Sequence, residues 1–203
     1  MIALRALAPY AADAVVAVRE ARCEVCSSPI GAEHRHVVEL GTRGALCVCQ
    51  PCSVLFSHAA PGSQFRTVPE RFVTDVAFAA NATSWAALGI PVTLAFFYVD
   101  STRDAVVACY PGPAGIIDAE LGLDAWSAVA ETTPLAGMLE PDVEALVVRG
   151  GRAEPRCHLV PISTAYELVG RLRSCWRGIS GGDAVERELA ELFADIQKKG
   201  ATR

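Results

Sequence analysis

Cys23-Glu-Val-Cys26 and Cys47-Val-Cys49-Gln-Pro-Cys52 are the stretches that decide how the N-terminal part of this 203-residue chain folds. In each C-x2-C pair, the two intervening residues let both sulfurs turn toward one ion, and two such pairs complete a tetrahedral site. We therefore predict that Cys23, Cys26, Cys49 and Cys52 bind one metal ion. A disulfide or redox role for the same pairs is the alternative interpretation.

The residues between the two pairs are expected to form a β-hairpin. The strand-like residues 33–40 and 45–49 flank a turn at Thr42 and Arg43, with a glycine on each side of that turn. A hairpin that carries two C-x2-C loops is the layout of a zinc ribbon. We therefore expect a zinc-ribbon-like module in this part of the chain.

A turn at this position predicts the pairing of the hairpin and the surroundings of the metal site. It would place Val38 opposite Cys47 and His36 opposite Cys49, with Cys47, Cys49, His36 and His34 on one face of the hairpin. His36 or Cys47 would then hydrogen-bond a metal-binding sulfur or replace one of the ligands. In the alternative interpretation, Cys47 packs as a small apolar residue and both histidines are solvated.

Zinc is the expected ion, because a closed set of four thiolates is typical of structural zinc sites. It would hold together a ribbon too small to have a core of its own. A single iron ion is the alternative, since rubredoxins also use paired C-x2-C loops. This chain departs from the rubredoxin pattern, because Gln50 stands after Cys49 where that pattern has proline.

Charge and hydropathy narrow the classes of partner. The net charge is −5, and within residues 21–60 three arginines are balanced by three glutamates, so we expect no nucleic-acid partner. We expect neither a signal peptide nor a membrane span, since the longest apolar stretch, residues 86–99, is short and contains Pro91. Free cysteines beside metal-type pairs favour a reducing, cytoplasmic location.

The whole chain is expected to have an α+β fold. It would consist of a small zinc-ribbon-like β-hairpin module followed by an antiparallel-sheet domain with C-terminal helices. We assign residues 1–60 to an N-terminal helix, over residues 11–21, and the metal module. Residues 61–75 have the composition of a linker, and residues 76–203 would form the α+β domain.

The expected elements of the second domain are strands and helices in alternation. Four antiparallel strands are predicted over residues 92–99, 105–110, 144–149 and 156–160. Helices are predicted to start at Asp124, Thr164 and Asp183, the last two with capping boxes that end at Glu167 and Glu186.

A search for catalytic motifs identifies few candidates. Residues 111–115 are rich in glycine and proline but match no phosphate-binding signature, so we expect a turn there. Cys157 and His158 are adjacent on a predicted strand and would point to opposite faces, so they cannot act as a nucleophile and its base. If the chain is an enzyme, Tyr98, Tyr110 and His158 are the first candidates around a pocket of the α+β domain.

A set of motifs spread over about residues 20 to 198 forms a pattern together with the cysteine pairs. These motifs are Glu33-His-Arg-His36, Leu88-Gly-Ile-Pro-Val92, Leu94-Ala-Phe-Phe97, Tyr110-Pro-Gly-Pro-Ala-Gly115, Pro141-Asp-Val-Glu-Ala-Leu-Val-Val148, Tyr166-Glu-Leu-Val-Gly170 and Trp176-Arg-Gly178. The pattern resembles an uncharacterised bacterial family encoded near genes of uptake nickel-iron hydrogenases. The resemblance implies an accessory or maturation role, with a hydrogenase subunit or a maturation factor as the protein partner.

Three functions follow from these observations as hypotheses. The favoured one is a non-catalytic metal-binding accessory protein that assists the assembly of a larger metalloenzyme through protein–protein contacts. The second is a rubredoxin-like iron protein that transfers electrons to a partner. The third is an unrecognised enzyme that uses a pocket in the α+β domain.

Overall fold

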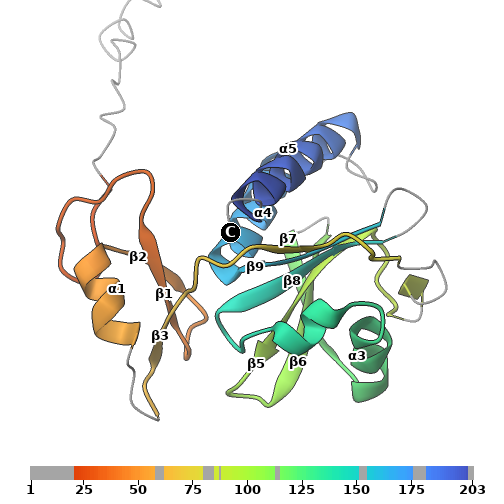
Figure 1. The fold of residues 1–203 in the computed structure, drawn as a ribbon, viewed down its shortest axis with the longest axis horizontal. Helices are drawn as coiled ribbons and strands as arrows, with labels where there is room; N and C mark the ends of the chain where they lie inside the picture. Colours follow the sequence, from red (N-terminus) through yellow and green to blue (C-terminus); the bar gives the residue numbers. More distant parts are fainter. Residues whose placement is uncertain are drawn as a thin grey trace, which may run out of the picture.

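The computed structural model describes residues 21–57, 62–79, 85–86, 88–112, 115–150, 155–175 and 182–200. These residues include an antiparallel three-stranded sheet, an antiparallel six-stranded sheet and two C-terminal helices (Figure 1). The predicted α+β fold is therefore confirmed. The helix expected over residues 11–21 lies, except for residue 21, outside the described residues.

The three-stranded sheet lies in the N-terminal part and has the strand order β2-β1-β3. Its elements, together with the helix that packs on it, are β1 (Arg35–Glu39), β2 (Ala45–Val48), α1 (Gln50–Ser57) and β3 (Phe65–Thr67). We call residues 21–57 and 62–68 the ribbon lobe. Its small core, in which every residue is at most 8 % exposed, consists of Cys23, Val37, Val48 and Cys52. Two of these four are predicted metal ligands, and the apolar residues that pack against this core are only partly buried, so the fully buried interior of the lobe is small; these residues are Ile30, Leu46, Phe56 and Phe65.

The hairpin of the ribbon lobe is shifted by two residues from the predicted register. His36 lies opposite Cys47, and Val38 lies opposite Ala45. The predicted pairs, Val38 with Cys47 and His36 with Cys49, are therefore wrong. Cys49 follows the last residue of β2 and packs with the small core, so it does not share a face with Cys47 and His36.

The loop between β1 and β2 explains this shift. The amide of Glu39 donates to the carbonyl of Gly44 at 2.9 Å, and the amide of Arg43 donates to the carbonyl of Glu39 at 2.9 Å. Four residues therefore form the loop, and the last of them, Arg43, has a φ of 62°. A two-residue turn at Thr42 and Arg43 would need positive φ or glycine at its centre, which a β-branched threonine disfavours.

Strand β1 belongs to two cores at once, because its successive side chains point to opposite faces. Val37 is fully buried in the small core beside the cysteines. Val38 is fully buried on the other face, together with Val68, in a large core formed mainly by the six-stranded sheet and the C-terminal helices. The ribbon lobe is therefore attached to the rest of the molecule along β1.

The six-stranded sheet has the order β4-β9-β8-β5-β6-β7, and every pairing in it is antiparallel. Its strands are β4 (Val73–Asp75), β5 (Leu94–Asp100), β6 (Ala105–Gly112), β7 (Gly115–Leu121), β8 (Glu144–Arg149) and β9 (Arg156–Pro161). The four predicted strands correspond to β5, β6, β8 and β9. Strands β6 and β7 pair as far as Gly112 and Gly115, so the segment predicted to be a turn joins these two strands.

Residues 61–75, expected to be a linker, contain two short strands. Strand β3 pairs with β1 of the ribbon lobe, and β4 pairs with β9 at the edge of the large sheet. Each strand has three residues, which is too short for alternation to be recognised in the sequence. The segment thus connects the two sheets and adds one strand to each.

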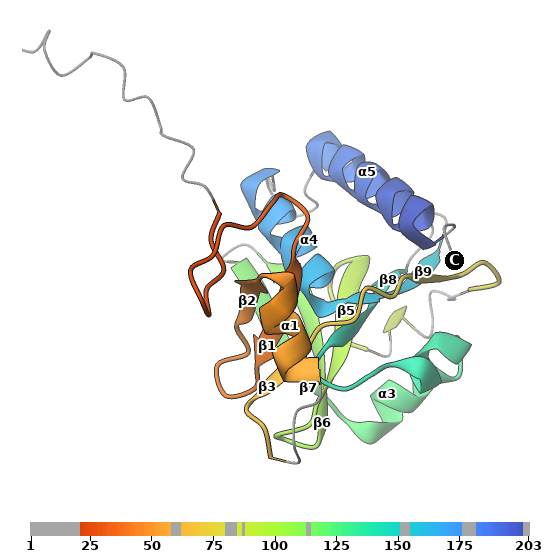
Figure 2. The same cartoon turned by 60° about the vertical axis from the view of Figure 1, so that its left-hand side comes forward.

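Helices cover both faces of the large sheet (Figures 1 and 2). They are α3 (Leu123–Ala130), the 3₁₀ helix η2 (Pro134–Met138), α4 (Ile162–Cys175) and α5 (Gly182–Gly200). Phe96 points toward α4 and α5, whereas its neighbour Phe97 points toward α3 and η2. Among the described residues, no helix has the length and apolar character needed to cross a membrane.

The helices begin at positions that differ from the predicted ones. Gly122 is the N-cap of α3, and Asp124 lies in the first turn instead. Helix α4 begins at Ile162, directly after β9, so Thr164 is inside the first turn and the predicted capping box is wrong. The Ile162 amide donates to the Val143 carbonyl at 2.9 Å, so a contact distant in sequence satisfies this amide. Helix α5 begins at Gly182, one residue before the predicted start.

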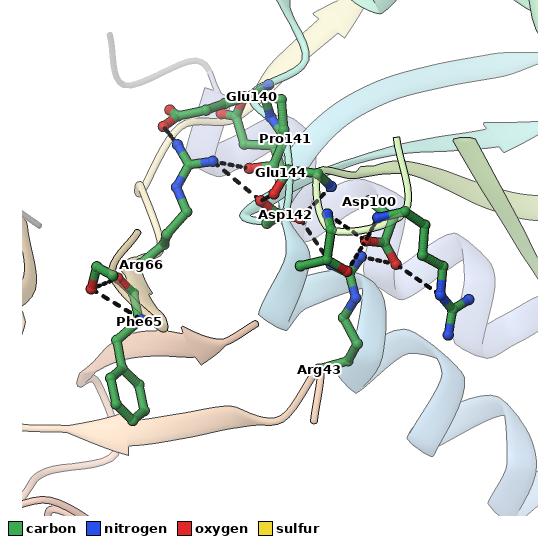
Figure 3. A network of polar contacts seen from close by, with 12 residues as sticks. Arg43, Phe65, Arg66, Asp100, Glu140, Pro141, Asp142 and Glu144 are labelled. Atoms are coloured by element: carbon green, nitrogen blue, oxygen red, sulfur yellow. Dashed lines mark hydrogen bonds and ion pairs between the residues drawn. The ribbon is translucent and has the colours of Figure 1, made fainter. Parts of the chain in front are cut away.

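Two arginines of the ribbon lobe reach carboxylates of the large sheet's loops (Figure 3). Arg43 pairs with Asp100 and with Asp142, whose Oδ1 lies 3.0 Å from the Nη1 of Arg43. Arg66 lies 3.3 Å from Asp142 and 2.8 Å from Glu140. The side chains of Asp100 and Asp142 are fully buried, so their charges require these partners. We call these five residues the arginine clamp, because they fix the ribbon lobe against the large sheet.

Candidate metal centre

The first cysteine pair lies on a tight loop before β1. The Cys23 amide donates to the Ser28 carbonyl at 2.8 Å, and the Ser27 amide donates to the Cys23 carbonyl at 2.8 Å. Ser27 has a φ of 62°, which lets the chain reverse within this loop. The Ser28 hydroxyl lies 3.3 Å from the Cys26 sulfur, and this contact lowers the pKa of Cys26. The loop thus holds two sulfurs on one side and stabilises a thiolate there.

The second pair lies where β2 passes into α1. Cys49 immediately precedes the helix, and its carbonyl accepts from the Ser53 amide at 3.0 Å. Pro51 is in the first turn, where its missing N–H costs no intrahelical hydrogen bond. Cys52 is in the same turn, so the start of the helix holds Cys49 and Cys52 close together.

The structure brings together the four cysteines predicted as metal ligands. The Sγ atoms of Cys23, Cys26, Cys49 and Cys52 all lie within 4.8 Å of one another. Those of Cys26 and Cys49 are 3.6 Å apart, whereas sulfurs around one tetrahedral zinc ion are separated by about 3.8 Å. All four cysteines are free thiols, so the structure does not contain the disulfides of the alternative interpretation. The donor set and its spacing fit one metal ion.

The electrostatics of the cluster also suit a cation. Burial acts to raise the pKa of Cys23, but backbone hydrogen bonds from Cys49, Cys26 and Val25 outweigh it and lower the pKa from 9.0 to about 6. The hydrogen bond of Cys52 with Cys49, followed by burial, raises the pKa of Cys52 to about 12. Four crowded thiols cannot all ionise alone, because neighbouring negative charges oppose one another. A bound cation would allow all four to become thiolates.

Exposure differs across the cluster. Cys23 is 1 % exposed and Cys52 is 8 % exposed, whereas Cys49 is half-buried and Cys26 is exposed. The cluster therefore lies near the surface of the ribbon lobe, with Cys26 as its exposed residue.

His36 and Cys47, predicted to support the four-cysteine site, belong to a different group. Within the described residues, neither side chain hydrogen-bonds one of the four sulfurs; the ligand atoms of His34, His36 and Cys47 instead lie within 4.8 Å of one another. The shifted register explains this grouping, because it places His36 directly opposite Cys47. The signal in the sequence was the spacing of His34 and His36 by two residues, which the predicted register placed beside Cys49.

The three candidate catalytic residues do not converge. Tyr98 packs on the face of the sheet covered by α4 and α5, while Tyr110 packs on the opposite face. His158 is fully buried, lies 2.9 Å from the Thr74 hydroxyl and stacks on Phe193. Burial lowers the pKa of His158 to about 4. The sheet itself separates the two tyrosines, so these three residues form no common site.

Comparison with known proteins identifies a family but no activity. No curated protein and no solved structure matches the chain. Residues 22–200, which include both sheets and all four cysteines of the cluster, match a family of unknown function, DUF5947. The chain therefore belongs to the DUF5947 family.

Proposed function

We propose that this protein is a non-catalytic metal-binding accessory protein that helps to assemble a larger metalloenzyme through protein–protein contacts. The observation that carries this proposal is the convergence of four cysteine sulfurs within 4.8 Å on the ribbon lobe. Four thiolates fill the coordination sphere of a tetrahedral ion and leave no position for a substrate. The cluster is therefore suited to building a rigid surface rather than to a reaction.

Zinc is the ion we propose for this site. Cys23, Cys26, Cys49 and Cys52 would hold it, and its chemistry there would be structural. The ribbon lobe has a core of four residues, two of which are these cysteines, so the ion would replace much of the missing apolar interior. We place the protein in the cytoplasm, and the seven free cysteines of the described part support a reducing compartment.

The ribbon lobe also has the surface that a protein partner would contact. It exposes three large apolar side chains: Val25 on the first cysteine loop is 42 % exposed, and Val54 and Leu55 on α1 are 52 % and 70 % exposed. Large exposed apolar side chains are groups that a protein partner would bury in an interface. The arginine clamp supports this role, because it keeps the lobe in one orientation.

A capture experiment from the native cell tests the proposal. The intact, metal-loaded chain is the bait, and an uptake nickel-iron hydrogenase subunit or one of its maturation factors is the partner we expect to recover. Leu55→Glu should abolish recovery. Leu123→Glu is the matched control, because Leu123 is 83 % exposed on α3, far along the chain from the ribbon lobe. Loss of recovery with both variants, or with neither, would contradict the assignment of the contact to the ribbon lobe.

The second candidate function, electron transfer by a single iron ion, rests on the exposure of Cys26. A solvent-accessible ligand would shorten the path for an electron to a partner. The visible absorption of the protein purified without added metal decides between the two functions. An iron–thiolate site is coloured, whereas the zinc site that we propose is colourless.

A further inference from the structure

We propose that His34, His36 and Cys47 form a second metal site, which takes a divalent transition-metal ion such as zinc, nickel or cobalt and leaves one coordination position open. The ligand atoms of the three side chains lie within 4.8 Å of one another. Imidazole and thiolate together suit borderline ions of this series. This inference goes beyond the proposed accessory role and does not depend on it.

The two metal sites lie on opposite sides of the hairpin. The four-cysteine cluster packs with Val37 and Val48, on one face of the β1–β2 hairpin. His36 and Cys47 alternate with these two valines and therefore point to the other face. The two groups share no residue, so one ion in each site is geometrically possible.

The side chain of His34 is already oriented as a ligand. Its Nδ1 lies 3.0 Å from the carbonyl oxygen of Gly31, so Nδ1 carries the proton and donates it to that oxygen. This leaves the lone pair on Nε2, which is buried and has no hydrogen-bond partner. A buried acceptor without a partner destabilises the protein, and a metal ion would satisfy it. A hydrogen bond from the second ring nitrogen to a carbonyl is how metal-binding histidines are normally fixed.

The His36 ring is near enough to complete the site. The ring centroids of His34 and His36 are 4.8 Å apart and the planes are tilted by 50°, so the two rings do not stack flat on each other. Burial, followed by the positive charge of His34, lowers the pKa of His36, whereas Glu167, Glu24 and Glu70 act in the opposite direction. The negative charge of these three carboxylates would favour a cation at this position.

The open coordination position faces a groove between the ribbon lobe and the C-terminal helices. The groove has a volume of about 1030 Å³ and is lined by all three proposed ligands and by Thr164 and Glu167 of α4. Three protein ligands with a free fourth position are typical of sites that exchange a water molecule or bind an incoming group. The second ion would therefore be exchangeable, whereas the ion in the closed four-cysteine site would not.

Nuclear magnetic resonance of the histidine ring nitrogens tests the proposal on the unmodified protein. The chain is first loaded with one equivalent of zinc, and a second equivalent is then added. We expect the Nε2 signal of His34 and one ring-nitrogen signal of His36 to shift, while the signals of the buried His158 stay in place as an internal control. The proposal is overturned if the second equivalent leaves His34 and His36 unchanged.

Substitutions then identify the third ligand and measure affinity. Cobalt added to the zinc-loaded protein should produce a thiolate-to-cobalt absorption band, which Cys47→Ser should remove. His36→Ala should weaken the binding of the second ion by at least about 100-fold. Loss of a residue that only hydrogen-bonds a metal ligand already weakens binding by about 10–100-fold. Thr164→Ala is the matched control, because it changes the same groove without removing a ligand atom, and it should keep the wild-type affinity.

One further measurement keeps the two proposals separate. His36→Ala and Cys47→Ser should both retain the first equivalent of zinc in the four-cysteine site. This retention also shows that the ribbon lobe of each variant is folded. If His36→Ala or Cys47→Ser binds the second ion as tightly as the wild type does, the second site is refuted and the accessory role is unaffected. If the first zinc is lost as well, the two groups form one site and the second site is refuted too.

Discussion

The arginine clamp should contribute strongly to stability, and Arg43→Met tests this. Arg43 is 16 % exposed and faces two fully buried carboxylates, Asp100 and Asp142. Its guanidinium also lies 5.0 Å from the centre of the Tyr98 ring, a contact that methionine can partly keep. The substitution therefore removes mainly the positive charge and leaves two buried negative charges with weaker compensation.

The size of the effect follows from what remains after the substitution. Removing one partner of a buried ion pair costs 3–5 kcal/mol in typical cases. Asp142 would keep its hydrogen bonds from Ser101 and its contact with Arg66, and Asp100 would keep the Thr102 hydroxyl. We therefore expect the lower end, a loss of about 3 kcal/mol in the free energy of unfolding, or about a 100-fold change in the equilibrium.

Urea unfolding of the zinc-loaded protein, followed by tryptophan fluorescence and circular dichroism, measures this loss. Arg66→Met is the matched control: Arg66 is 32 % exposed and one of its partners is 48 % exposed, so we expect a loss of about 1 kcal/mol. A double-mutant cycle with Asp142→Asn isolates the pair, and asparagine tolerates the φ of 67° at that position. A coupling energy below about 0.5 kcal/mol, or a smaller loss for Arg43→Met than for Arg66→Met, would show that Arg43 does not stabilise the buried carboxylates.

The other predictions concern the metal site, the dependence of stability on pH, and the packing around two glycines. Cys49→Ser should increase hydrogen exchange in the ribbon lobe and leave the six-stranded sheet protected; unchanged exchange in the lobe would contradict a metal-dependent fold. Burial acts to raise the pKa of Asp142, but hydrogen bonds and a neighbouring arginine lower it below 3.8. The contribution of the ionised Asp142 to stability should therefore be present above about pH 4 and be lost as the pH falls through that lowered pKa, which acid titration of stability would show. Gly150→Ala should destabilise the protein by about 1–3 kcal/mol, because the new Cβ would collide with the Trp85 ring. Gly170→Ala, in the open on α4, should stabilise it by about 0.5–1 kcal/mol, and thermal unfolding of both variants compares the signs.

The cysteine spacing was enough to predict which four sulfurs come together. A C-x2-C loop is a local structure, and two such loops joined by a hairpin leave few alternatives. The register of that hairpin was not predictable in the same way. It depends on Arg43, whose backbone has a positive φ and whose side chain pairs with Asp142, 99 residues further along the chain. A contact of that range leaves no local pattern in the sequence.

The large sheet shows the same division between local and distant information. Strands β5, β6, β8 and β9 are apolar enough to be recognised singly. Strand β4 has three residues and exists because β9 offers it an edge, and β7 carries Asp118 and Glu120 among its apolar residues. The start of α4 at Ile162 likewise depends on the distant carbonyl of Val143 rather than on a cap at Thr164.

X-ray absorption spectroscopy of the protein with one equivalent of zinc shows whether the four cysteines bind one ion together. We expect a single zinc ion surrounded by four sulfurs at about 2.3 Å, with no nitrogen or oxygen ligand. Mass spectrometry of the same sample should show Cys23, Cys26, Cys49 and Cys52 unbridged, as they are in the structure. A mixed set of nitrogen and sulfur ligands, or a chain that holds no metal and carries disulfides between these cysteines, would contradict this expectation.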